Sequence, residues 1–283
     1  AAPARRVLPG LEEVSWTSSS GRVSGWFARG SSEGAVLLVH GSGGNREQML
    51  EEMRVLHDRE LSVLAFDLPG HGASEGDGRY GEPMRRAISS AVDFLERDAS
   101  HEPLTGIFGF SLGGHVALQA AAQDARLRAV AVAGTPADLG RQAELEYESF
   151  GSWFVGPAFW AMRLRGLDPD ERAEDAAARL ARPLLVIAGG RDSIVPRAWV
   201  EPIYARASSP KQWLFLSRAE HGHYVASSGD EFTRALGDFF VTALAAPVSL
   251  AAPVSQAAPM NPTAAQTAPR RAATPTASAG RAL

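Results

Sequence analysis

Residues 109–114 read Gly109-Phe110-Ser111-Leu112-Gly113-Gly114 and close a short apolar run that begins at residue 104. The stretch after them, 115–123, is rich in Ala and Leu, which are strong helix formers. This order predicts a strand, a sharp turn and a helix, with Ser111 at the turn. The glycines of the Gly-x-Ser-x-Gly pattern leave room for a strained serine backbone, as in a nucleophile elbow. The competing interpretation is a glycine-rich turn that contains an incidental serine.

The composition is that of an ordinary globular protein, with 45% hydrophobic and 21% charged residues in 283. The net charge of -4 gives no electrostatic support to a nucleic-acid partner. The absence of cysteine excludes disulfides, thiolate zinc sites and cysteine nucleophiles. No apolar run approaches the roughly 18 residues of a membrane span. The chain begins at Ala1 without a methionine, so an upstream signal or anchor stays open and the compartment is not predicted.

Apolar runs and helical stripes alternate along most of the chain. An alternating pattern around a Ser-Gly turn predicts a hairpin over 13–28. Beyond it we expect strands over 35–39, 61–66, 104–110, 129–133, 184–188 and 212–216, and helices over 46–58, 82–98, 115–123, 199–207 and 230–244. Strands that alternate with helices imply a mostly parallel central sheet with helices on both faces, an α/β fold.

Three segments fall outside this rhythm. Residues 1–12 are predicted to be an irregular lead-in to the domain over 13–245. Residues 137–181 contain no strand-like run but many aromatic side chains, which predicts a small helical lid and favours a substrate with an apolar group; plain core is the alternative. Residues 246–283 are rich in Ala, Pro, Thr and Ser, so we expect a disordered tail.

Four polar positions come directly after predicted strands: Ser42, Ser111, Asp192 and His221. The carboxyl ends of parallel strands share one edge of a sheet, so these residues are expected to converge in space. A serine hydroxyl needs a base near neutral pH, and a histidine base needs a carboxylate to orient it. Ser111, Asp192 and a histidine occur in the chain order of a Ser-Asp-His triad. The alternative for Asp192 is an N-cap or turn residue.

The base is either His221 or His223, since both follow the last predicted strand. His221 suits the loop length better, and Gly222 behind it gives room. The oxyanion of a tetrahedral intermediate needs two N–H donors, and the backbone N–H groups of Ser42 and Leu112 are the candidates. A phosphate-binding loop is a weaker interpretation of the glycines around Ser42, because no lysine follows.

The remaining histidines indicate structural roles, and His40 is expected to anchor its loop by hydrogen bonds. No pair has a His-x-x-x-His spacing, and His221-x-His223 without nearby carboxylate ligands is weak evidence for a metal, so we predict no metal site. We also predict no cofactor.

Together, these motifs resemble the α/β-hydrolase superfamily over about residues 10–244. The motifs that carry the resemblance are His40-Gly41-Ser42-Gly43-Gly44-Asn45-Arg46, Asp67-Leu68-Pro69-Gly70-His71-Gly72-Ala73-Ser74, Gly109-Phe110-Ser111-Leu112-Gly113 and Gly190-Arg191-Asp192-Ser193-Ile194-Val195-Pro196. The hairpin with Gly25-Trp26-Phe27 looks closer to the BEM46-like, serine aminopeptidase-type branch. Members of that branch often carry an N-terminal membrane anchor, which this chain does not show.

The resemblance implies a serine hydrolase with a Ser111–Asp192–His221 triad and an oxyanion hole at Ser42 and Leu112. We expect cleavage of a small-molecule carboxylic ester through an acyl-enzyme. Serine at the elbow argues against haloalkane dehalogenase and epoxide hydrolase chemistry, which use aspartate there. The alternatives are a peptidase, amidase or acyltransferase with the same triad, or a non-catalytic binding protein of the same fold.

Overall fold

In the part of the chain that the structure describes, eight strands form one sheet in the order β1-β2-β4-β3-β5-β6-β7-β8. The first two strands and β4 are antiparallel neighbours, and the strands from β3 to β8 run parallel. The strands are β1 (Glu12–Ser18), β2 (Gly21–Ala28), β3 (Gly34–Val39), β4 (Ser62–Phe66), β5 (Leu104–Phe110), β6 (Leu127–Ala133), β7 (Leu184–Gly189) and β8 (Lys211–Leu216). The predicted α/β architecture with a mostly parallel sheet is confirmed.

The computed structural model describes residues 4–98, 104–141, 155–164, 166, 171–208 and 210–245. Within α6 (Val155–Leu164) it leaves out the side chains of residues 155, 158, 159 and 162. The predicted tail over 246–283 and much of the predicted lid lie outside the described residues.

The register of the parallel strands aligns their carboxyl ends. Val39 of β3 pairs with Phe66 of β4 on one side and with Gly109 of β5 on the other. The loops after these strands therefore leave the sheet at the same edge, as do the loops after β6 and β7. This alignment brings the predicted site residues together.

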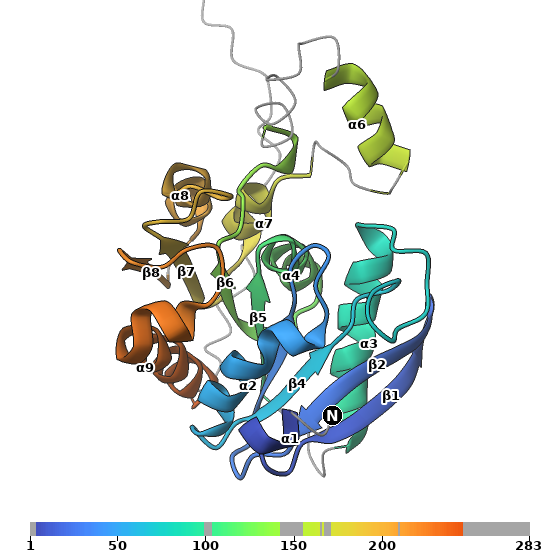
Figure 1. The fold of residues 1–283 in the computed structure, drawn as a ribbon, viewed down its shortest axis with the longest axis vertical. Coiled ribbons are helices and arrows are strands. Elements are labelled where there is room, and N and C mark those ends of the chain that lie inside the picture. The colour runs from blue at the N-terminus through green and yellow to red at the C-terminus, as the bar shows by residue number, and fades with distance from the viewer. Residues whose placement is uncertain are drawn as a thin grey trace, which may run out of the picture. The chain divides into compact units, whose positions relative to one another are not determined.

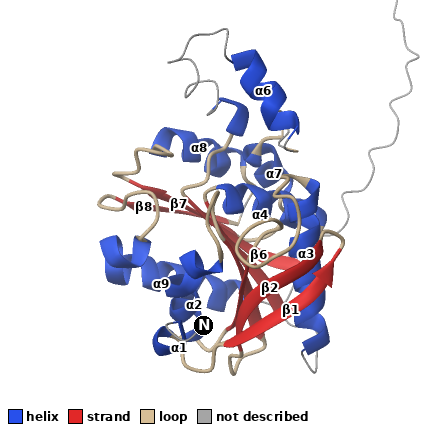
Figure 2. Cartoon of the chain, turned by 45° about the vertical axis from the view of Figure 1, so that its right-hand side comes forward, coloured by secondary structure: helices blue, strands red, loops and turns tan. Residues whose placement is uncertain are grey.

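Helices cover both faces of the sheet (Figure 1, Figure 2). One face carries α1 (Ala4–Val7), the 3-10 turn η1 (Arg46–Met49), α2 (Leu50–His57) and α9 (Tyr224–Ala245). The other carries α3 (Glu82–Asp98), α4 (Leu112–Gln123), α7 (Ala173–Arg179) and α8 (Arg197–Arg206). Strand β3 faces both layers, because Val36 and Leu38 join the first core while Leu37 and Val39 join the second. This explains its continuous apolar sequence.

The lead-in over 1–12 is not irregular throughout, which corrects the prediction. Residues Ala4–Val7 form a turn of helix, and Ala4, Leu8 and Leu11 are buried in the core beside α2 and α9. The Leu8 N–H donates to the Ala4 carbonyl at 2.9 Å, so these two side chains lie on the same face of the helical turn. The segment is too short for this pattern to stand out in the sequence.

The two ends of the insertion between β6 and β7 meet at Asp138 and Arg172, a contact that we call the neck. Asp138 and Arg172 form an isolated β-bridge and an ion pair at 3.2 Å, and the Ala173 N–H donates to the Ala137 carbonyl at 2.9 Å. Helix α7 follows at once and buries small side chains against α4 and α8. Residues 173–181 therefore belong to the body of the domain, which corrects the predicted lid boundary of 181.

Helix α9 begins earlier than predicted. It starts at Tyr224 instead of residue 230, and its axis is interrupted at Gly229, whose φ of 44° and ψ of -120° are not helical. The predicted helix corresponds to the part after this kink. The early first turn carries Tyr224 to the edge of the sheet where the site residues lie.

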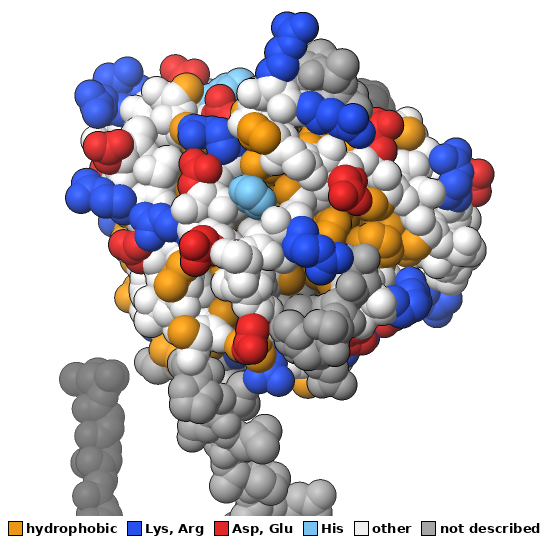
Figure 3. Space-filling view, turned by 90° about the horizontal axis from the view of Figure 1, so that it is seen from below, with side chains coloured by type: hydrophobic (Ala, Val, Ile, Leu, Met, Phe, Trp, Pro, Cys, Tyr) orange, Lys and Arg blue, Asp and Glu red, His pale blue; other side chains and the backbone are white. Residues whose placement is uncertain are grey.

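Among the helices in the described ranges, none is both long and apolar enough to span a bilayer. On the face seen in Figure 3, cationic and anionic side chains are interspersed, with small hydrophobic areas between them. That face therefore presents no extended patch of a single sign.

Candidate active site

Ser111 lies at the junction of β5 and α4 in a strained conformation, with φ 53° and ψ -123°. The turn is tightly packed. A side chain on Gly109 would lie 2.5 Å from the Gly114 Cα, and one on Gly113 would lie 2.3 Å from the His40 carbonyl oxygen. The Ser111 N–H donates to the Ala133 carbonyl at 2.9 Å, which fixes the turn against β6. The glycines of the motif thus permit the strained turn.

Three side chains from three loops form a hydrogen-bonded chain. His221 Nδ1 lies 2.7 Å from Asp192 Oδ2, and His221 Nε2 lies 3.1 Å from Ser111 Oγ. Asp192 Oδ1 accepts the N–H groups of Ile194 and Val195 at 3.0 and 2.7 Å. With an Nδ1–H donated to the carboxylate, Nε2 is left to accept the serine hydroxyl proton. Asp192 is 6% exposed, so the ring faces a buried carboxylate.

His223 has a different environment from His221. Its side chain is exposed, its φ is 53°, and its carbonyl accepts the Ser227 N–H at 3.0 Å near the start of α9. The structure therefore brings His221, and not His223, between the serine and the aspartate.

The loop after β3 packs directly against the elbow. A side chain on Gly41 would lie 3.2 Å from the Ser111 Cβ, and the Gly41 N–H donates to Gln48 Oε1 at 2.8 Å. Ser42 follows in this loop. Leu112 is the first residue of α4, so its N–H has no acceptor one turn earlier in the helix. The two N–H groups predicted for the oxyanion thus belong to adjacent segments.

His40 joins the loops after β3 and β4, as expected from its position. Its Nδ1 lies 2.8 Å from the Gly41 carbonyl, and its Nε2 accepts the Leu68 N–H at 3.0 Å. These contacts require the neutral ring with its proton on Nδ1. Burial lowers the pKa of His40 to about 4, because the charged ring would lose its hydration. The predicted anchoring role is confirmed.

Asp67 organises the second of these loops. Its carboxylate accepts the Arg46 N–H and the Arg46 guanidinium, both at 2.7 Å, and the Ala73 N–H at 2.8 Å. A side chain on Gly72 would collide with this carboxylate at 2.2 Å. The Arg46 guanidinium also lies 5.2 Å from the Trp26 ring centre. The motifs at 40–46 and 67–74 are therefore one connected unit beneath the site.

Three residues near the site were not predicted from the sequence. A side chain on Gly134, whose φ is +54°, would lie 2.6 Å from the Tyr224 hydroxyl, 3.2 Å from His221 Nδ1 and 3.3 Å from Asp192 Oδ2. The Phe110 ring lies 4.8 Å from the His221 ring. A glycine directly after the predicted strand 129–133 was the signal available for Gly134. Tyr224 had no such signal.

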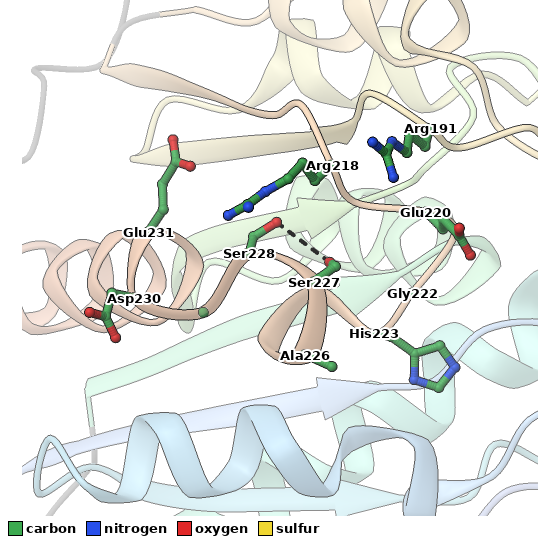
Figure 4. A pocket seen from close by; sticks show the side chains of 11 residues that line it. Arg191, Arg218, Glu220, Gly222, His223, Ala226, Ser227, Ser228, Asp230 and Glu231 are labelled. Atoms are coloured by element: carbon green, nitrogen blue, oxygen red, sulfur yellow. Dashed lines mark hydrogen bonds between the residues drawn. The ribbon is translucent and has the colours of Figure 1, made fainter.

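Hollows flank the site on two sides. A cavity of about 350 Å³ lies between the start of α2 and the His221 loop and is lined by Phe110, His221 and Tyr224, among others. A larger one of about 870 Å³ lies beside His223 and the first turn of α9, where Figure 4 shows Arg191 and Arg218 above Ser227 and Ser228. The larger hollow contains none of Ser111, Asp192 and His221, so its size does not mark the site.

Within the described ranges, no group of three or more His, Asp or Glu side chains is arranged to hold a metal ion.

A family model described as "Alpha/beta hydrolase family" matches residues 36–277. The chain belongs to the alpha/beta hydrolase family. Uncharacterized protein Rv2307c of Mycobacterium tuberculosis is 31% identical over 77% of this hydrolase and 75% of its own length. Uncharacterized protein YfhR of Escherichia coli is 26% identical over 82% of this chain and 81% of its own. The placement in the BEM46-like branch stays a prediction.

Among solved structures, the esterase Pf2001 of Pyrococcus furiosus is similar to this hydrolase with a TM-score of 0.71. The match covers 85% of this chain and 93% of the esterase at 21% identity. An esterase domain from Rhodothermus marinus matches with a TM-score of 0.59 over 83% of this chain and 98% of its own, at 20% identity. At these identities, the likeness shows the shared fold.

Proposed function

We propose that this hydrolase is a serine esterase that cleaves a carboxylic ester through an acyl-enzyme intermediate. The observation that carries the proposal is the unbroken chain of hydrogen bonds from Ser111 through His221 to Asp192, with the serine held at a strained turn. A serine hydroxyl becomes a nucleophile when a histidine base takes its proton and a carboxylate orients that histidine, and these hydrogen bonds provide both groups. The esterases among its structural neighbours support the same reaction class.

In the first half of the reaction, Ser111 Oγ attacks the ester carbonyl carbon while His221 Nε2 takes the hydroxyl proton. Asp192 stabilises the imidazolium and holds its Nδ1–H. The tetrahedral intermediate then collapses, the carbon–oxygen bond to the alcohol breaks, and the imidazolium returns the proton to the leaving alkoxide. An acyl group remains on Ser111.

The second half repeats these steps with water. His221 takes a proton from water as the hydroxide oxygen attacks the acyl carbon, and the proton then returns to Ser111 Oγ as the acid departs. In both halves the N–H groups of Ser42 and Leu112 are proposed to donate to the oxyanion. Losing one such donor typically costs 10²–10³ in kcat.

A panel of model substrates tests this proposal. Purified protein, Ser111→Ala and His221→Gln are assayed with p-nitrophenyl esters of increasing acyl length, with the matching anilides, and with esters in the presence of added alcohol. We expect turnover of esters by the parent alone and a loss of roughly 10⁴-fold or more in each variant.

The anilides and the added alcohol distinguish the esterase from the alternative functions. Faster cleavage of anilides than esters would replace the esterase by an amidase, and transfer of the acyl group to the alcohol in preference to water would indicate an acyltransferase. Equal activity of the parent and Ser111→Ala would refute the mechanism, and parent inactivity on every substrate would favour a binding protein.

A further inference from the structure

The 350 Å³ cavity beside His221 borders the proposed reaction centre on one side only. Its lining includes His221 and Phe110, whose ring centres lie 4.8 Å apart. Among the described residues that line it, neither Ser42 nor Leu112 occurs, and these two carry the N–H groups proposed to hold the oxyanion. The cavity therefore adjoins the proposed base and not the proposed oxyanion hole.

The two ends of an ester leave the tetrahedral intermediate in different directions. His221 Nε2 lies 3.1 Å from Ser111 Oγ, and in the proposed reaction it returns the proton to the leaving alkoxide. The alkoxide oxygen must therefore lie within hydrogen-bond reach of His221, while the carbonyl oxygen points towards the N–H groups of Ser42 and Leu112. A cavity that shares His221 with the reaction centre thus suits the alcohol end of the ester, and the acyl end extends elsewhere.

Most of the described wall of this cavity is apolar. Val7 comes from the end of α1, and Met49 and Leu50 come from the start of α2. Val7 is 40% exposed, whereas Ala4 on the same short helix is buried in the core. The volume is near the lower end of the range of about 300–1,000 Å³ that ligand pockets span. The wall and the size both suit an alkyl or aryl group of medium length.

The charged groups of the wall are all carboxyl groups. Glu47, Glu51 and Glu52 line the cavity, and no lysine or arginine is among the described residues of its lining. The wall therefore offers no cation to pair with an anionic ligand, and the carboxyl groups repel one. An alcohol that carries a carboxylate or a phosphate does not fit this cavity.

We propose that this cavity is the alcohol subsite of the hydrolase, and that its substrate is an ester of an apolar, non-anionic alcohol of medium length. The inference rests on the proposed esterase function, because it needs an alkoxide that leaves beside His221. Burial of the alkyl surface against Val7, Met49 and Leu50 provides the affinity. Since the acyl end lies outside the cavity, changes in its wall should alter selectivity for the alcohol and leave selectivity for the acyl group in place.

Ester kinetics with one varied end test this assignment. Acetate esters of ethanol, butanol, hexanol and octanol vary the alcohol, and methyl esters of butanoate, hexanoate and octanoate vary the acyl group. In the parent, kcat/KM should rise by about two- to fourfold for each methylene added to the alcohol until the cavity is filled. The acetate ester of 6-hydroxyhexanoate, which ends in a carboxylate, should be at least tenfold poorer than hexyl acetate.

Val7→Trp is the diagnostic variant, because it places a large ring at an accessible position of the cavity wall. It should lower kcat/KM for hexyl and octyl acetate at least tenfold relative to ethyl acetate, and it should change the ratios among the methyl esters by less than twofold. Val241→Trp is the matched control, since Val241 is 41% exposed and lies on α9 outside the described lining. Its two series should match those of the parent.

Val7→Thr is the second variant, because it adds a hydroxyl group at almost constant shape. It should weaken the dependence of kcat/KM on alcohol length. Parent-like alcohol ratios in both Val7 variants would overturn the proposal. So would a change in the acyl ratios in place of the alcohol ratios, which would assign the cavity to the acyl group.

Alcohol binding without turnover separates the cavity from the reaction. Met49 lines the cavity and is one of five methionines, so protein labelled with ¹³C at the methionine methyl groups reports on it by NMR, and Met49→Leu assigns its signal. We expect n-hexanol to shift the Met49 signal saturably, hexanoate to leave it in place, and Val7→Trp to weaken the hexanol effect at least tenfold. A Met49 signal that hexanol does not move would overturn the subsite.

The two experiments fail in different ways. Binding of hexanol at Met49 without turnover of any ester would refute the esterase function and keep the cavity as an alcohol site. Turnover of esters without any effect of alcohol length, together with an unmoved Met49 signal, would refute the subsite and keep the esterase.

Discussion

Gly134 lies directly behind the hydrogen bond between His221 and Asp192. The space that its missing side chain leaves is bordered by His221 Nδ1, Asp192 Oδ2 and the Tyr224 hydroxyl. Its N–H donates to the Ile187 carbonyl at 3.1 Å, so the backbone cannot easily retreat. A methyl group at this position must displace one of the three polar atoms. Misplacement by about 1 Å can cost 10²-fold in rate.

Gly134→Ala should therefore reduce kcat about a hundredfold while KM changes little. The nearest atom to the new methyl is the Tyr224 hydroxyl at 2.6 Å, so Tyr224→Phe in the same chain should recover part of the activity. The control is Gly10→Ala, which also has a positive φ but no atom within 4 Å of the added Cβ. Ester kinetics on the four proteins check this, and parent-like kcat in Gly134→Ala would contradict it.

His40 should make the stability of the protein depend on pH. Its pKa falls from 6.5 in the unfolded chain to about 4 in the fold, because burial disfavours the charged ring. Above pH 6.5 the His40 ring is neutral in both the folded and the unfolded chain, so its contribution to stability is fully present. As the pH falls towards 4, the unfolded chain binds a proton that the fold resists, so stability is lost at about 1.4 kcal/mol per pH unit.

Denaturant titrations between pH 7 and pH 4 check this with His40→Gln. Between pH 6.5 and pH 4, the free energy of unfolding should fall less steeply with decreasing pH in this variant than in the parent. The two slopes should differ by about 1.4 kcal/mol per pH unit. Buried His115 acts in the same direction and Glu52 in the opposite one, but both are present in the two proteins and cancel. Parallel curves would show that His40 titrates normally in the fold.

At the scale of elements, the loops after β3 and β4 behave as one unit. His40 links them from one side, and the Asp67 carboxylate links them from the other through Arg46 and Ala73. Asp67 is 1% exposed, so protein donors must satisfy its charge, and among the described residues the Arg46 N–H, the Arg46 guanidinium and the Ala73 N–H do so. This buried pair maintains the loop that carries Ser42.

Asp67→Asn should lower the free energy of unfolding by about 2–4 kcal/mol, because it removes the buried carboxylate 2.7 Å from the Arg46 guanidinium, whose other carboxylate contact, with the exposed Glu13, is 3.9 Å long. Thermal and urea unfolding measure the loss. Glu75→Gln, at an exposed carboxylate that accepts the Arg22 N–H, is the matched control and should leave the melting curve in place. A parent-like melting curve for Asp67→Asn would show that this network does not support the fold.

The elements that could be predicted are those whose sequence has a period of its own. The strand at 35–39 is a continuous apolar run, and the helix at 82–98 has an apolar stripe, so both match β3 and α3 closely. Helix α1 and the first turn of α9 could not be predicted, because they are short and are stabilised by burial of Leu8 and Tyr224 against distant parts of the chain.

At the scale of the whole molecule, the insertion between β6 and β7 leaves and re-enters the domain at one point. The bridge from Asp138 to Arg172 closes its neck, and Arg85 of α3 binds Glu171 just outside that bridge. Within α6, Trp160 and Leu164 are four residues apart and both largely exposed. The lid function predicted from the aromatic residues of this segment stays a prediction.

Replacing residues 140–170 by a short Gly-Ser linker should keep the free energy of unfolding close to that of the parent, because the neck contacts remain. The ratio of kcat/KM between long and short acyl esters should fall, since each buried methylene contributes about 0.8 kcal/mol. Urea unfolding and an ester series measure the two effects. An unchanged ratio would show that the insertion does not bind the acyl chain.

The convergence of the site could also be predicted at this scale. The rule that parallel strands end at one edge brings Ser111, Asp192 and His221 together, although up to 110 residues separate them in the chain. The space behind them could not be predicted, because Gly134 and Tyr224 acquire their environment only when β6 and α9 pack. Site residues that belong to a sequence motif could be predicted, and site residues whose role depends on packing between distant elements could not.

Intact-mass labelling with a fluorophosphonate tests the central claim most directly, because it needs no knowledge of the substrate. The reagent phosphonylates an activated serine and remains attached, so each adduct is counted by mass. We predict a single adduct on the parent and none on Ser111→Ala. No adduct on the folded parent, or the same adduct on Ser111→Ala, would contradict the claim that Ser111 is an activated nucleophile.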